Sequence, residues 1–149
     1  MKKIFLTAAL AVAVIASSFA SDVKVDKRIQ TAFQKEFASA FNPRWEALAE
    51  GLMHVTFTQN VEVMDAYYNE DAQLVSFART VAPDQLPLLV SKTINEKFIG
   101  SQISDIRELV SQNETSYLVT ARSESKVVVA RVYPSGSVQI VKKVKTGKE

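Results

Sequence analysis

Cysteine is absent from the 149-residue chain, and histidine and tryptophan occur once each. Without cysteine the protein forms no disulfide and carries no lipid-modified N-terminal cysteine, so a packed core must stabilise it. Metal sites built from His and Cys are excluded for the same reason. Glycine occurs only four times, without the clustering that a phosphate-binding loop needs. We therefore predict neither a cofactor nor a metal site.

The first 20 residues have the pattern of a cleavable secretory signal peptide. Two lysines precede an uncharged apolar stretch from Ile4 to Ala16. Ser18 and Ala20 fit the −3 and −1 positions of a cleavage site, which predicts cleavage before Ser21. The apolar stretch is shorter than the roughly 20 residues of a membrane-spanning helix, and no later segment is long and apolar enough to span. We therefore expect an exported protein, periplasmic or extracellular.

The charge of the exported part is balanced. The chain has 18 Lys and Arg against 16 Asp and Glu, and the two lysines near the N-terminus account for the difference. A net charge of zero over residues 21–149 argues against a nucleic-acid binder, which usually has an excess of basic groups on one face. Four lysines lie close together near the C-terminus, at 142, 143, 145 and 148. We interpret them as a solubilising strand end and tail rather than a binding site.

An amphipathic helix is predicted from Val25 to Phe41. Its apolar stripe recurs every four residues and consists of Val25, Ile29, Phe33, Phe37 and Phe41, with Ala32 and Ala40 beside it. Asp22 or Asp26 is expected to cap the start of the helix, and Asn42-Pro43 to end it. A stripe on one side of a polar helix indicates that the helix packs on another layer.

Strand-like segments follow this helix, and the same order then recurs. A second helix is predicted from Pro87 to Phe98, with Asp84 as its cap. The predicted strands are 44–48, 52–59, 61–68, 73–81, 103–111, 116–122, 127–133 and 137–144. In the second of these, Met53, Val55 and Phe57 alternate with His54, Thr56 and Thr58, which is typical of a strand with one buried face.

The two halves predict an α+β fold made of tandem repeats. Each repeat is a helix plus an antiparallel meander of about four strands, at about residues 25–82 and 84–145, within a single domain of residues 21–149. Two copies are too few for a solenoid. We therefore expect side-by-side sheets that share one core.

Several short motifs occur in a recognisable order along the chain. They are the helix end at Phe37, Asn42 and Trp45 in the first strand, the hairpin from Ala66 to Leu74, the helix opening Leu86-Pro87 and the segment from Val132 to Val138. From about Val25 to Val144 they resemble the small exported PepSY-like proteins described as β-lactamase-inhibitor-like. Ala72 departs from the Gly usual in the first turn of that family, and Pro134 from the Asp frequent in the second.

The resemblance implies helices packed on one face of an antiparallel sheet of about eight strands, with the other face more open. In the inhibitor after which the family is described, that open face grips a partner protein. Function does not follow from fold alone, so the residues themselves must be considered.

Catalytic groups are scarce. His54 is the only histidine, and Asp65 on a neighbouring predicted strand is its candidate orienting partner as a general base. The alternative, which we favour, is a surface histidine on the polar side of a strand. No Gly-x-Ser-x-Gly elbow supplies a nucleophile. The acidic run Asn69-Glu70-Asp71 lacks the spacing of an EF-hand and is typical of a hairpin turn. We predict no catalytic residue and no enzyme.

Apolar residues occur on both sides of several predicted strands. In the strand 61–68, the set of Met64, Ala66 and Tyr68 competes with Val63 and Tyr67 for the inner face, and alternation does not decide between them. The second face is then either partly buried by the other half or a dimer partner, or presents an apolar, aromatic patch to a ligand. Our candidate binding residues are Trp45, Tyr67 and Tyr117, because aromatic residues dominate binding hot spots. For each of them, packing in the core is the commoner role.

The leading hypothesis is a non-catalytic exported binding module that takes a protein or peptide on the open sheet face or along an edge strand. An inhibitor of an envelope or extracellular hydrolase is one form of it. The alternative is a structural or self-assembling envelope protein, a homo-oligomer in which Lys126 and Arg131 guard strand edges against uncontrolled pairing. The third hypothesis is an enzyme that uses His54.

Overall fold

We describe the protein from a computed structural model, which places residues 23–112 and 114–147. The predicted signal peptide lies outside these ranges. No helix among the residues described is long and apolar enough to cross a membrane. Two α-helices and eight strands follow one another as α2 (Lys27–Glu36), β1 (Phe41–Ala47), β2 (Met53–Gln59), β3 (Glu62–Tyr68), β4 (Leu74–Thr80), α3 (Leu88–Lys97), β5 (Gln102–Ser111), β6 (Glu114–Arg122), β7 (Lys126–Val132) and β8 (Val138–Lys145), with short 3₁₀ turns at Ala49–Gly51 and Pro83–Gln85.

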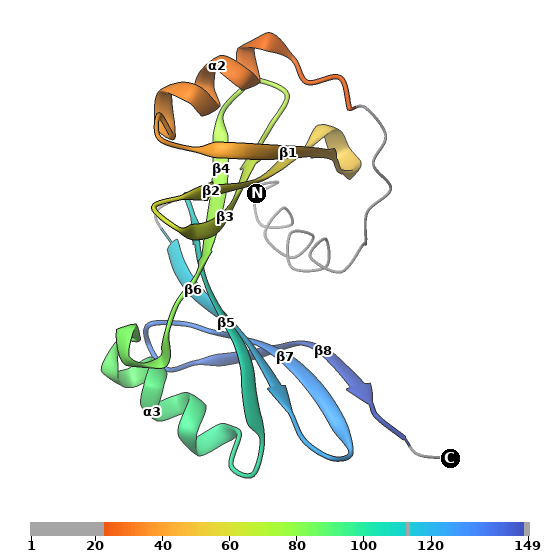
Figure 1. The fold of residues 1–149 in the computed structure, drawn as a ribbon. Helices are drawn as coiled ribbons and strands as arrows, with labels where there is room; N and C mark the ends of the chain where they lie inside the picture. Colours follow the sequence, from red (N-terminus) through yellow and green to blue (C-terminus); the bar gives the residue numbers. More distant parts are fainter. Residues whose placement is uncertain (1–22, 113, 148–149) are drawn as a thin grey trace, which may run out of the picture.

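The eight strands form a single antiparallel sheet in sequence order, β1 to β8. Both helices lie on one face of this sheet, each over its own half, as Figure 1 shows. The predicted α+β class with two helix-plus-meander halves is therefore confirmed. The expectation of side-by-side sheets with one shared core is wrong, because β4 pairs directly with β5 and each helix covers a separate apolar cluster.

The cluster under α2 is aromatic. Phe33 lies edge-on to Phe57, with ring centroids 5.0 Å apart, and edge-on to Trp45 at 5.3 Å. Asp26 caps the helix by accepting a hydrogen bond from the backbone N–H of Arg28. The helix is shorter than predicted: it ends at Glu36.

Phe41, predicted as the last member of the helical stripe, lies in β1 and is 58 % exposed. The Asn42-Pro43 pair, predicted to end the helix, is also inside β1. The helix has already ended at its C-cap residue Phe37, six residues before Pro43, so the Asn42-Pro43 pair does not terminate it.

The cluster under α3 is aliphatic. Val90 and Ile94 of the helix are buried against Ile106, Val119 and Val132 of the sheet. Pro87 is the N-cap residue, and Asp84 lies in the preceding 3₁₀ turn. The prediction that Asp84 caps this helix is therefore wrong.

The face away from the helices is called here the open face. In β2 the predicted alternation is confirmed, since Val55 and Phe57 belong to the cluster under α2 and His54 and Thr56 point the other way. In β3 the structure decides what the sequence left open: Ala66 and Tyr68 pack under α2, so Tyr67 lies on the open face.

A third, smaller apolar cluster lies on the open face near the middle of the sheet. It consists of Ala78, Leu109 and Leu118, with Val129 and Val141 packed against it. Figure 1 shows the sheet strongly twisted, with β1–β2 and β7–β8 at its two ends. The sheet edges are β1 and β8. Lys126 and Arg131 belong to β7, an interior strand, so the prediction that they guard an edge is wrong.

Candidate functional site

Charged and polar side chains of four strands meet on the open face. They form what we call the polar cluster, and its members are Glu46 (β1), His54 and Thr56 (β2), Asp65 (β3) and Arg107 (β5). Strand register brings most of them together, because Glu46 pairs with His54, and Thr56 pairs with Asp65. Residues directly opposite on neighbouring strands have Cβ atoms about 5 Å apart, so polar contacts across the strands are expected.

His54 lies between two carboxylates. Its Nε2 is 2.7 Å from Oδ1 of Asp65, and its Nδ1 is 3.4 Å from Oε2 of Glu46. A neutral imidazole donates from one nitrogen only, so both contacts are hydrogen bonds only when the ring is protonated. His54 and Asp65, the candidate base and its candidate orienting partner, therefore lie in direct contact. The side chain of His54 is 15 % exposed, so it is held within the sheet surface rather than free in solvent.

Asp65 is the centre of the polar cluster. Oδ1 accepts hydrogen bonds from Thr56 and His54, and Oδ2 pairs with the guanidinium of Arg107. Burial alone would raise the pKa of Asp65, but the hydrogen bond from His54 and the charge of Arg107 outweigh it and lower this pKa to about 2. Asp65 is therefore ionised at neutral pH and ties β3 to β5, 42 residues away along the chain.

Tyr67 stacks on the ring of His54, with centroids 4.7 Å apart and planes 11° apart. Register explains the contact, since His54 and Tyr67 are paired residues of β2 and β3. Burial, with the nearby charge of Asp65, raises the pKa of Tyr67 to about 12. The phenol is therefore neutral at physiological pH and holds the imidazole plane in place.

The two ring nitrogens of His54 both lie against carboxylates, whereas a general base needs a nitrogen that can reach a substrate proton. Within residues 23–112 and 114–147, no group of three or more His, Cys, Asp or Glu side chains could hold a metal ion. Fixed charges on a rigid sheet can instead orient the polar groups of a bound partner.

The other two candidate residues lie on the helix side of the sheet. Trp45 packs on Phe33 in the cluster under α2. Tyr117 is 5 % exposed in the cluster under α3, and its hydroxyl donates to Glu108 at 3.3 Å. Tyr67 alone of the three lies on the open face. A binding role for all three stays a prediction.

Sequence reasoning missed Glu46 and Arg107. Glu46 could have been found, because it lies in a predicted strand next to that of His54. Arg107 gave no signal, because its contact with Asp65 depends on the pairing of β4 with β5. The Asn69-Glu70-Asp71 turn is confirmed: Oδ1 of Asn69 accepts hydrogen bonds from the backbone N–H of Asp71 and of Gln73, at 3.1 and 2.9 Å.

The chain matches no protein-family model and no curated protein sequence. Its fold is similar to that of several solved proteins. A BLIP-like protein from Bacteroides fragilis is 19 % identical with a TM-score of 0.70, over 85 % of this chain and 92 % of that one. A DUF2874 family protein from Bacteroides uniformis is 15 % identical with a TM-score of 0.72, over 82 % and 90 %. A Bacteroides eggerthii protein proposed to be periplasmic is 12 % identical with a TM-score of 0.73, over 83 % and 90 %. The chain therefore has the BLIP-like fold, with two helices on one face of an eight-stranded antiparallel sheet.

Proposed function

We propose that the chain is an exported, non-catalytic binding module that grips a protein or peptide partner on its open face. The observation that carries the proposal is the polar cluster, in which hydrogen bonds and an ion pair centred on Asp65 join β2, β3 and β5, and Glu46 of β1 contacts His54. Groups fixed in this way lose little entropy when a partner binds. The export prediction is supported by the similar protein that is proposed to be periplasmic.

The size of the open face supports a macromolecular partner. Eight strands spaced about 4.8 Å apart extend roughly 34 Å across the sheet, which is enough for a protein interface of ordinary size. On that face the ion pair of Arg107 and Asp65 lies beside the buried apolar cluster of Ala78, Leu109 and Leu118. The resemblance to β-lactamase-inhibitor-like proteins also favours the open face as the surface that binds a partner. An inhibitor of an envelope or extracellular hydrolase is the specific form that we favour.

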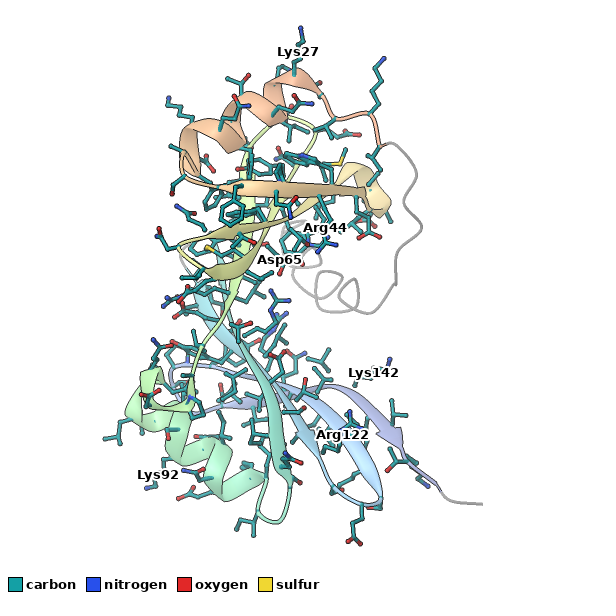
Figure 2. All side chains as sticks on the ribbon, viewed as in Figure 1. Lys27, Arg44, Asp65, Lys92, Arg122 and Lys142 are labelled. Carbon is teal, nitrogen blue, oxygen red and sulfur yellow. The ribbon has the colours of Figure 1, made fainter. Side chains whose placement is uncertain are left out.

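Arg44 and Arg122 allow the open face to be tested without disturbing either helix cluster. Both are exposed and, by register, share the face of Thr56 and Leu118. Figure 2 shows them on the side of the sheet away from Lys27 of α2 and Lys92 of α3. The test variant is Arg44→Glu/Arg122→Glu. The matched control is Lys27→Glu/Lys92→Glu, which makes the same charge change on the helices.

The experiment has two stages. Protein immobilised after expression from the full-length sequence is exposed to envelope extract and culture medium of the native organism, and bound proteins are identified by mass spectrometry. Each candidate partner is then purified and titrated calorimetrically against the wild type and both variants. We expect the open-face variant to weaken binding at least tenfold and the helix variant to leave it unchanged. Equal weakening by both variants would exclude the open face as the binding surface.

Tyr67 is the candidate binding residue that the open face retains. Tyr67 is only 2 % exposed, so we propose that it acts by holding the His54 ring, and Tyr67→Phe, which keeps that ring contact, should leave the affinity unchanged. Trp45 and Tyr117 pack against the helices from the other side, and we propose that they support the sheet beneath the bound partner.

A further inference from the structure

The topology places three of the lysines near the C-terminus on an edge strand of the sheet. Lys142, Lys143 and Lys145 are exposed and belong to β8, which pairs with β7 on one side only. The outer backbone N–H and C=O groups of an edge strand are a template for another strand. Figure 2 shows Lys142 rising from β8 on the side of the open face.

The two sheet edges differ in how well they can accept a further strand. In β1, Pro43 has no N–H to donate, Asn42 has a left-handed φ of 58°, and the register shifts between Phe41 and Arg44. Such features block strand addition. β8 contains no proline. Its own irregularity lies between Ile140 and Lys142, after which residues 142–145 pair in regular register with residues 126–129.

The positive charge of the β8 edge favours a negatively charged partner strand. By register Lys142 lies on the open face with Val144, and Lys143 and Lys145 lie on the helix face. Lys126 adds a further positive charge because it pairs with Lys145. Lysines on both faces would place like charges together if two β8 edges paired in this region, which is destabilising. An added strand with carboxylates opposite these lysines is instead stabilised by each pair of opposite charges.

We propose that β8 accepts an extended acidic segment of a partner protein as a ninth, edge-added strand. Backbone hydrogen bonds along residues 142–145 would hold the segment, and the lysines would select its charge. The proposal goes beyond the open-face function, because it concerns a second surface with its own recognition chemistry.

The probe is a fluorescein-labelled peptide with the core Glu-Val-Glu-Glu. In antiparallel register its carboxylates fall opposite Lys145, Lys143 and Lys142, and its valine falls opposite Val144. A twin peptide carries N-methyl groups on alternate residues, which removes backbone hydrogen bonding but keeps the charge. Binding to protein expressed from the full-length sequence is followed by fluorescence anisotropy, and protection of β8 amides by hydrogen exchange.

We expect the wild type to bind the probe and not its N-methylated twin, with slower exchange of β8 amides. Lys142→Gln/Lys143→Gln/Lys145→Gln should weaken binding about tenfold or more, since each exposed pair contributes modestly. The matched control, Lys24→Gln/Lys27→Gln/Lys35→Gln, removes three exposed lysines elsewhere and should bind as the wild type does. Arg44→Glu, in the opposite edge strand β1, should also leave the affinity unchanged, which separates the β8 edge from the part of the open face around Arg44.

Four results would overturn the proposal. They are no binding to the wild type, equal binding of the N-methylated twin, equal binding by the lysine variant, and protection of β8 that rises with protein concentration alone. Equal binding of the N-methylated twin would mean that the edge is only a general cationic patch. Protection that rises with protein concentration alone would mean that a second copy of the chain pairs with β8.

Discussion

Asp65 is the residue on which the order of the open face depends most. Its carboxylate contacts a hydroxyl, an imidazole and a guanidinium from β2 and β5. Removing one partner of a buried, paired charge leaves the other without compensation. Glu46 contacts the same imidazole, but its side chain is 44 % exposed and the contact is 3.4 Å long, so water can replace it.

We expect Asp65→Asn to lower the free energy of unfolding by about 3 kcal/mol, because Arg107 and His54 lose their charged partner. Glu46→Gln, the matched substitution at an exposed carboxylate, should cost less than about 1 kcal/mol. Urea unfolding followed by circular dichroism measures both. Similar costs for the two variants would mean that the charge of Asp65 does not hold the polar cluster together.

Acid should weaken the wild type through the same group. The pKa of Asp65 is lowered from 3.8 to about 2 in the folded protein. Its stabilising contribution is therefore complete above pH ~4 and disappears as the pH falls through about 2. A shift of this size corresponds to about 2 kcal/mol. Urea unfolding between pH 5 and pH 2 should show a steeper loss for the wild type than for Asp65→Asn, and parallel curves would contradict the assignment.

At the scale of elements, local sequence patterns predicted strands well and their ends less well. Alternation in β2 was sufficient to place His54 and Thr56 on the face opposite Val55. Element ends depend on single backbone conformations that spacing does not reveal. Val61 was predicted to begin a strand, yet it is the second residue of the β2–β3 turn, with φ at 66° after Asn60 at 49°. Two consecutive left-handed residues are typical of a type I′ turn.

Val61→Gly should stabilise the protein. A β-branched residue with left-handed φ is strained by about 1–2 kcal/mol, and Val61 is 96 % exposed, so its side chain contributes little packing. After the entropy cost of glycine, we expect a gain of about 0.5–1 kcal/mol in the free energy of unfolding. Val63→Gly, in β3, should instead be destabilising. A loss of stability in Val61→Gly would show that the valine makes a contact worth more than its strain.

At the scale of the whole molecule, the number and order of elements could be predicted, but not how the halves join. Each half has its own helix and cluster, and only the β4–β5 ladder makes the sheet continuous. Ion pairs reinforce that junction on both faces. Asp65 pairs with Arg107 on the open face, and Arg79 pairs with Glu108 at 2.6 Å on the helix face. The partners lie 42 residues apart in the first pair and 29 in the second, separations over which no spacing rule operates.

This junction predicts that the two halves unfold as one unit, as the expected single domain requires. Ile29 of α2 and Ile94 of α3 are both 4 % exposed, and each change to valine should cost about 1 kcal/mol. In a cooperative domain either substitution speeds exchange of the slowest amides in β2 and in β7 alike, by about fivefold. Hydrogen exchange with mass spectrometry measures both strands in one sample. An effect limited to β2 in Ile29→Val and to β7 in Ile94→Val would instead make the β4–β5 ladder a boundary between two separately unfolding units.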